Sequence, residues 1–342
     1  MNSFEPNWVS PPGETITEVV PEPQKWLSTT LGLPWKEAGE ILTGEAEITI
    51  GLAAKLATSI GSSPEFWMAR ECQYRTQLEA RDDKAKKLIS KLPLQEMIRM
   101  GWLEESSDED AVFQFFGVNS LSEWSAKNMS LLNSVSFRSS KFQGNKASVL
   151  AWLRRGLIES KTLKLGVWAP DELQDLIPEI RNLSKKKAPR EFYPRLQELG
   201  ASCGVAIVAV APPKGCTVFG AVRFSDSKNP VIAVSPRGRT DDQFWFTLFH
   251  EIGHLVLHYG EDTSSARGVQ QLESEANDFA AAALIRPAEW DRLRRLKLSH
   301  KAIIRFSNRV GICPGVVVGQ LQFFGIVPHS HYNGLKRSYS WD

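Results

Sequence analysis

The hydrophobic and polar positions change their spacing along the chain, and each change marks a new class of expected element. Apolar residues recur at helical spacing in most of the first half of the chain. From about residue 196 they gather in short runs bounded by Pro, Gly, Asn and Asp, a pattern typical of strands. Strands are expected over residues 204–211, 218–224 and 230–234. Helical spacing returns after residue 240, so the sequence predicts an α+β fold.

The first region is expected to form an all-α bundle. Its helices are predicted over residues 23–31, 34–42, 52–60 and from residue 64 onward. Gly32 and Gly44 interrupt the helical spacing, and proline stands at the first turn of several of these helices. A helix, a glycine turn, a second helix and then two more helices is the layout of a helix-turn-helix bundle.

The middle region has helical spacing but no recognisable chemical motif. Helices are expected there over residues 81–103, 110–116, 120–132 and 146–159. The whole pattern predicts three parts: a helix-turn-helix bundle over residues 1–80, a helical connector over 81–190 and an α+β domain over 191–342.

The clearest chemical signal is FWFTLFHEIGHLVLH, at residues 244–258. A helix turns once every 3.6 residues, so His250 and His254 stack on one face, where two imidazoles can hold one metal ion. Glu251 is placed to take a proton from a water held by that metal, as in zinc hydrolases. The flanks are apolar almost all round, which predicts a buried helix whose histidines need partners. The alternative is a pair of core histidines bonded to carbonyls.

A catalytic zinc usually has three protein ligands and one open position, so a third ligand is expected downstream. An astacin-like third histidine is excluded, because residue 260 is glycine. The next candidates lie in LESEANDFAAAALIRP, which is expected to be a helix from residue 272 to 285. We expect Glu275 to be the third ligand, because it shares a stripe with two core-facing positions. Glu273 is the alternative, and Asp278 is expected to contact a ligating histidine.

Residues 196–290 resemble the ImmA/IrrE family of metallo-endopeptidases. The resemblance rests on NPVIAVSPRGRTDDQFWFTLFHEIGHLVLH followed by ESEANDFAAAALIRPAEW. It implies a gluzincin-like, zincin-type peptidase domain with His250 and His254 as zinc ligands and Glu251 as catalytic base. The third ligand would be the glutamate of the ExEAN stretch. It also implies cleavage of a regulatory protein, often a repressor, that controls a gene circuit.

The first region resembles DNA-binding domains of the Xre/HigA antitoxin type, through PGETITEVV, ILTGEAEIT and LAAKLATSIGSSPEFWMARECQY. Its charge argues against DNA, because residues 1–80 hold five Lys and Arg against eleven Glu. Phosphate contacts dominate the affinity for duplex DNA. Trp35 and Lys36 are the candidate groove contacts, and a homodimer would bring further basic residues. Operator DNA and a protein partner therefore both stand as predictions for this region.

Other features narrow the class of protein. Four scattered cysteines favour reduced thiols over a cysteine zinc site. The start of the chain has no basic segment followed by an apolar core, and apolar runs are far shorter than the ~20 residues that span a bilayer. We therefore expect a cytoplasmic protein that does not enter membranes. His331 and Tyr332 are candidates for stabilising an oxyanion, a task that zinc peptidases give to His, Tyr or Arg.

These patterns together predict a zinc-dependent endopeptidase with a regulatory task. Its substrate would be a repressor or another component of a toxin-antitoxin, phage or stress-response circuit. The alternative is an antitoxin or transcriptional regulator that binds DNA or a toxin and uses the peptidase fold as a binding platform without turnover.

Overall fold

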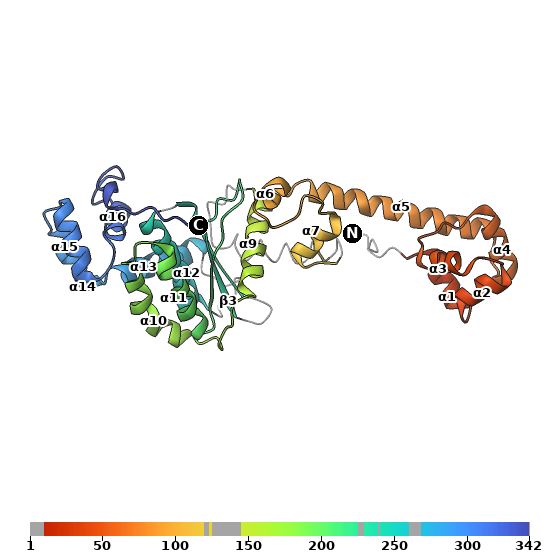
Figure 1. Ribbon diagram of the computed structural model, residues 1–342, viewed down its shortest axis with the longest axis horizontal. Coiled ribbons are helices and arrows are strands. Elements are labelled where there is room, and N and C mark those ends of the chain that lie inside the picture. The colour runs from red at the N-terminus through yellow and green to blue at the C-terminus, as the bar shows by residue number, and fades with distance from the viewer. Residues whose placement is uncertain are drawn as a thin grey trace. The chain divides into compact units, whose positions relative to one another are not determined.

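The computed structural model describes residues 10–119, 123–124, 145–224, 229–238, 240–259 and 268–341 (Figure 1). The chain divides into two compact units, Met1–Ser90 and Lys91–Asp342. The sequence predicted boundaries after residues 80 and 190 instead. The first difference arises because helix α5 (Pro64–Ile89) continues past residue 80 without a break.

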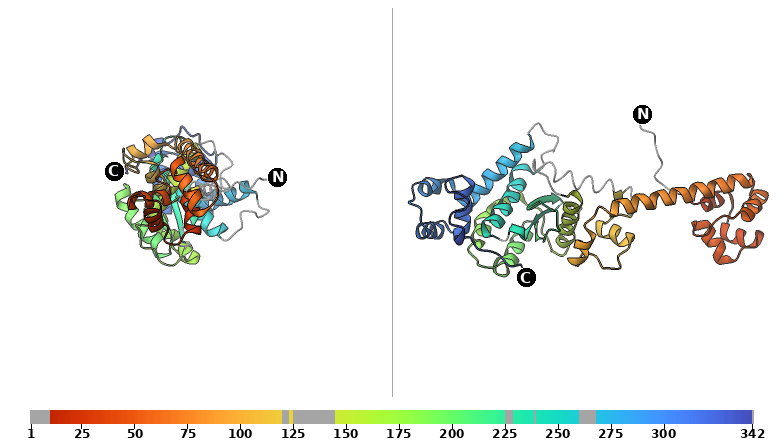
Figure 2. Two further views of the ribbon diagram at one scale, coloured as in Figure 1. Left: turned by 90° about the vertical axis from the view of Figure 1, so that its right-hand side faces the viewer. Right: turned by 90° about the horizontal axis from the view of Figure 1, so that it is seen from above.

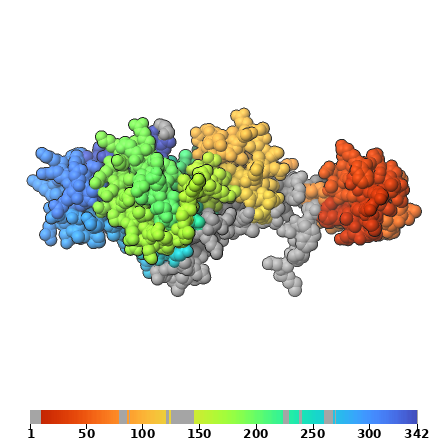
Figure 3. Space-filling view, turned by 60° about the horizontal axis from the view of Figure 1, so that its bottom comes forward, coloured from red at the N-terminus to blue at the C-terminus, as the bar shows by residue number. Residues whose placement is uncertain are grey.

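The first unit is a bundle of helices that closes into one body (Figure 3). Its helices are α1 (Pro12–Val19), α2 (Pro23–Thr30), α3 (Trp35–Thr43), α4 (Ile50–Ile60) and α5. Gly44 and Gly61 follow α3 and α4 with φ of 81° and 93°, a conformation that costs glycine least. The core between the helices is apolar and includes Ile16, Leu27, Ile41, Leu56 and Trp67. The predicted helices are confirmed within one or two residues, and α1 is additional.

The second unit is built on a three-stranded sheet. Its strands are β1 (Ala206–Ala209), β2 (Gly220–Phe224) and β3 (Pro230–Val234), in the order β1-β3-β2. Strand β1 pairs parallel with β3, and β2 pairs antiparallel with β3. All three predicted strands are confirmed, although the first two are shorter than expected. Among the described residues β2 is an edge strand, because it pairs with β3 alone.

Helices cover both faces of this sheet (Figures 1 and 2). Helix α9 (Lys146–Ser160) packs on the face that carries Val208 and Ala233, and it approaches closely at Gly156. The other face carries Ile207 and Ile232 and meets the long helix α12 (Asp241–His258). Successive side chains of a strand alternate between faces, so the apolar runs read as continuous in the sequence.

The remaining helices surround this core. They are α6 (Leu94–Arg99), α7 (Glu109–Phe116), α10 (Pro170–Leu183), α11 (Pro189–Ser202), α13 (Val269–Leu284), α14 (Pro287–Arg294), α15 (His300–Val310) and α16 (Pro314–Phe323), with short 3-10 turns at η1 (Pro236–Gly238) and η2 (Asn333–Leu335). Helices α10 and α11 belong to the core, since α10 contacts α12 and α11 contacts β1. No helix in the described part of the chain is both long and apolar enough to cross a bilayer.

One expectation for the middle region differs from the structure, and a second lies mostly outside the described residues. The helix expected over residues 81–103 is two helices, because α5 ends at Ile89 and α6 begins after Pro93. Proline lacks the N–H that would continue the helix and disfavours helical backbone in the residue before it. Of the helix expected over residues 120–132, only residues 123–124 lie within the described part of the chain.

Candidate metal centre

Helix α12 carries the two histidines at the centre of the second unit. Its apolar positions Trp245, Leu248 and Ile252 are fully buried against the sheet and the neighbouring helices. His254 is 2% exposed, so its side chain is fixed by packing. The Nε2 atoms of His250 and His254 lie 3.1 Å apart, which confirms that the two rings share one face of the helix.

A glutamate from α13 completes a triangle of donor atoms with these histidines. Glu273 Oε1 lies 3.2 Å from His254 Nε2, and Glu273 Oε2 lies 3.5 Å from His250 Nε2. These three residues form a cluster that can hold a metal ion. The structure places Glu273, the alternative candidate, beside the two histidines, whereas Glu275, the expected third ligand, contacts His258.

The reason lies in the face that α13 turns toward α12. Ala276, Ala280 and Leu284 are fully buried and define the inner stripe of α13. Glu273 is one turn before Ala276 on that stripe, whereas Glu275 lies to its side. The sequence pattern was ambiguous here, since four consecutive alanines at 280–283 give no clear period.

The spacing of the donor atoms fits a small tetrahedral cation. Ligand bonds of about 2.0–2.1 Å in a tetrahedral zinc site place neighbouring donor atoms about 3.3 Å apart. The distances of 3.1, 3.2 and 3.5 Å, the last two measured to different oxygens of Glu273, lie around that value. Glu273 Oε1 is buried and accepts no aligned hydrogen bond from the described residues. A single proton shared by His250 Nε2 and His254 Nε2 leaves Glu273 Oε1 without a partner. One cation can bind all three residues.

The charges around Glu273 keep it ionised. Burial disfavours its charged form, but the close polar contacts with His250 and His254 and their positive charge outweigh burial and lower the pKa of Glu273 to about 2. For His250, burial lowers the pKa, while Glu273, Glu251 and Asn277 together raise it above its usual value. The carboxylate is therefore ready to bind a cation without first losing a proton.

Each histidine is oriented by a partner on its other ring nitrogen. His250 Nδ1 lies 3.0 Å from Asn277 Oδ1, and a proton donated there leaves Nε2 free for a metal. The sequence predicted Asp278 for such a contact. Asp278 instead lies exposed on α13, because the inner stripe that carries Glu273 also carries Asn277, one turn later.

A longer chain of polar side chains supports His254. His254 Nδ1 lies 3.1 Å from His258 Nδ1, and His258 Nε2 lies 2.9 Å from Glu275 Oε2. Gln271 Nε2 donates to Glu275 Oε1 at 2.9 Å. With a metal on His254 Nε2, the protons are assigned: His254 donates to His258, and His258 donates to Glu275. Glu275 thus acts on the site through two histidines.

Two glycines allow the close approaches that build the centre. A Cβ at Gly253 would lie 3.0 Å from Phe279 Cδ1 and 3.3 Å from the backbone of Ala276, so glycine lets α13 approach α12. A Cβ at Gly220 would lie 2.5 Å from Glu251 Oε1. The carboxylate of Glu251 therefore lies directly against the backbone of edge strand β2, and Glu251 is 5% exposed.

The oxyanion candidates make their described contacts with other residues than the donor triangle. Tyr332 packs against His300 with ring centroids 5.2 Å apart, and His331 Nδ1 lies 3.3 Å from Ser330 Oγ. Among the described contacts, none joins either residue to the donor triangle. They belong to the turn after α16, whose hydrogen bonds end on Gln322 and Asn333.

The candidate DNA contacts lie at the start of α3 in the first unit. Trp35 is 59% exposed. Lys36 Nζ lies 3.4 Å from Glu40 Oε1 on the next turn of the same helix. An exposed pair of this kind contributes little to stability, but it leaves less positive charge for a phosphate.

Sequence reasoning missed three residues that shape the site. His258 continues the histidine stripe one turn beyond His254, and this spacing was the signal for a contact. Asn277 follows Glu273 by four residues, which places both on one helical face. Gly220 had no local signal, because its role depends on β2 lying against α12.

Residues 217–306 match the peptidase M78 family, described as an IrrE N-terminal-like domain. The match contains β2, β3, α12 and α13, and so the whole donor triangle. It does not include the first unit. No curated protein matches the chain.

Proposed function

We propose that this peptidase M78 domain is a zinc-dependent endopeptidase that cleaves a regulatory protein. The observation that carries the proposal is the triangle of His250, His254 and Glu273 at distances of 3.1–3.5 Å. Two histidines and a glutamate form a ligand set of catalytic zinc, with a fourth position for water or substrate. When bound, the metal would supply a Lewis acid for the scissile carbonyl and lower the pKa of the attacking water.

The protein's own groups have separate tasks in this reaction. Glu251 is adjacent to His250 and buried beside β2, where it takes a proton from the attacking water and later passes it to the leaving amine. Strand β2 pairs only with β3 in the described part of the chain, and its other edge would bind an extended peptide and place a peptide bond near Glu251. Burial of the site strengthens each of these electrostatic interactions.

We also propose that the first unit docks a protein partner and so brings a substrate to the peptidase domain. Residues 1–80 have a net charge of −6, from five basic and eleven acidic residues. Lys36 of α3 is already paired with Glu40. A negatively charged surface is unsuited to duplex DNA, where phosphate contacts supply most of the affinity. Binding to operator DNA is the competing outcome, and a gel-shift titration at several salt concentrations distinguishes the two.

The first experiment measures the metal content of the full chain by elemental mass spectrometry, without added zinc. The expected result is about one zinc per chain in the wild type and a loss of zinc in His254→Ala. Cleavage is then measured with peptides from a digested proteome, and Glu251→Gln is the matched control because it keeps all three metal ligands. A protein that stays metal-free when zinc is supplied, or a Glu251→Gln variant with full cleavage, would contradict the proposal.

A second candidate function is a regulator that uses the peptidase fold without turnover. The separate helical unit at the start of the chain favours it, since a recognition module alone is sufficient for an antitoxin or a repressor. Both functions predict bound metal. They differ in cleavage, which only the endopeptidase shows and only with Glu251 present.

A further inference from the structure

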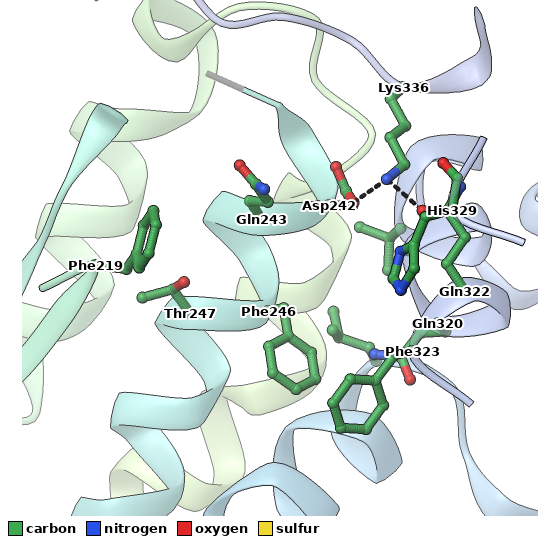
Figure 4. A pocket seen from close by; sticks show the side chains of 13 residues that line it. Phe219, Asp242, Gln243, Phe246, Thr247, Gln320, Gln322, Phe323, His329 and Lys336 are labelled. Carbon is green, nitrogen blue, oxygen red and sulfur yellow. Dashed lines mark hydrogen bonds and ion pairs between the residues drawn. The ribbon is translucent and has the colours of Figure 1, made fainter. Parts of the chain in front are cut away.

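A pocket of about 290 Å³ opens on the part of α12 that precedes His250 (Figure 4). Gln243, Phe246 and Thr247 line it from α12. These positions precede His250 by seven, four and three residues, so they lie on the same face of the helix. At 1.5 Å per residue, they are about 10, 6 and 4.5 Å from His250 along the axis.

The pocket has an apolar body made by separate elements. Phe246 and Phe323 lie side by side with ring centroids 5.3 Å apart, and Leu284 lies fully buried at the wall. Phe219, just before β2, lies across from them (Figure 4). Phe219 is 48% exposed and Phe323 is 51% exposed. Aromatic rings left open to water around a cavity are typical of a place where another apolar group binds.

The charges in the pocket are already matched to each other. Lys336 Nζ lies 2.7 Å from Asp242 Oδ2 and donates to Gln322 Oε1 at 2.7 Å. A charged guest would be repelled by one member of this pair and would lose its own hydration. The pocket is therefore unsuited to a side chain with a net charge.

We propose that this pocket receives a large uncharged aromatic side chain of the substrate, Phe, Tyr or Trp, one to three residues from the scissile bond. An aromatic ring can pack on Phe246 and Phe323 and adds no net charge beside the Asp242–Lys336 pair. The distance limit follows from the axial separation to His250 and from the ~3.3 Å that each residue of an extended peptide spans. The proposal rests on the proposed peptidase function and adds the class of substrate.

The test uses zinc-loaded full-length protein and a peptide library made by digesting a proteome. Cleavage products are identified by mass spectrometry. Phe, Tyr and Trp should be enriched about fivefold over Ala at one position within three residues of the cleaved bond. Phe323→Ala should reduce this enrichment for all three aromatic residues.

Ile304→Ala is the matched control. Ile304 is 39% exposed on α15 and does not line the pocket. It should therefore leave the preference as in the wild type. Cleavage with no aromatic preference, or the same preference in Phe323→Ala as in Ile304→Ala, would overturn the pocket assignment while leaving the peptidase function intact.

A binding measurement keeps the proposal testable if no peptide is cleaved. Glu251→Gln protein is titrated with N-acetyl-tyrosinamide and N-acetyl-alaninamide, with saturation-transfer NMR as the readout. Binding of the tyrosine compound alone, weakened by Phe323→Ala, would support the pocket although the peptidase function had failed. Equal signals from the two compounds would overturn it.

Discussion

Replacing each of the two nearby glutamates of α13 separates the metal ligand from its supporting residue. Glu273 contacts both ligand histidines directly, whereas Glu275 is two hydrogen bonds away from the donor triangle. Glutamine has nearly the shape of glutamate but no negative charge, so it tests the charge at each position. We expect Glu273→Gln to lose much more zinc affinity than Glu275→Gln.

The expected loss of zinc affinity in Glu273→Gln follows from the number of protein ligands. Binding of zinc by a protein site is worth roughly 10–16 kcal/mol, so the loss of one of three ligands should cost about 4 kcal/mol, or roughly a thousandfold in affinity. Changing an outer partner of a ligating histidine typically costs about 10- to 100-fold. The cost at Glu275 should lie at the lower end, because glutamine keeps an oxygen that accepts from His258.

The assay is a competition titration of metal-free protein with zinc and a chromophoric chelator, at fixed pH. Glu289→Gln on α14 is a suitable control, since Glu289 pairs only with the exposed Arg292 and Arg309 in the described contacts. Folding of each variant is checked by circular dichroism. The ligand assignment would be wrong if Glu275→Gln lost as much zinc affinity as Glu273→Gln, or more.

Three further predictions follow from the packing around α12. Gly220→Ala should displace the carboxylate of Glu251, because the new Cβ would lie 2.5 Å from Oε1. Cleavage should therefore fall while the zinc content stays unchanged. Equal loss of cleavage and zinc would contradict this role of Gly220. His258→Phe should weaken zinc binding about 10- to 100-fold by removing the acceptor of the His254 proton, and unchanged affinity in the chelator titration would exclude that support. Burial raises the pKa of Asp241 from 3.8 to about 6, so metal-free protein should lose up to about 3 kcal/mol of stability as the pH rises between these values. Asp241→Asn should therefore stabilise the protein more at pH 7.5 than at pH 4.5 in urea unfolding, and an equal gain at both pH values would refute the assignment.

Local patterns in the sequence were sufficient to predict most helices and strands and half of the candidate metal site. Proline and glycine positions predicted most helix ends of the first unit, because their backbone preferences act without help from the rest of the fold. The three strands were recognisable as short apolar runs. His250 and His254 were predictable as a pair, because their spacing on one helix determines their separation.

The third donor depended on how two helices pack. Glu273 and Glu275 are two residues apart and point to different sides of α13, so the choice between them is a choice of helix rotation. That rotation is decided by contacts between Gly253 of α12 and Ala276 of α13, together with the buried Ala280. A run of alanines fits several rotations equally well, and only the tertiary contacts select one.

The sequence by itself thus determined that this protein has a helix with a histidine pair and an adjacent carboxylate, since all three residues lie within two turns of one element. Only the tertiary structure decided what faces them, which is Glu273 from α13 and the backbone of Gly220 from β2. It also decided that Phe323 of α16 packs on Phe246 to wall the pocket. The physical reason is the range of the interactions. Helical spacing is set by hydrogen bonds between residues four apart, whereas a site between elements is set by packing among residues that are distant in the chain.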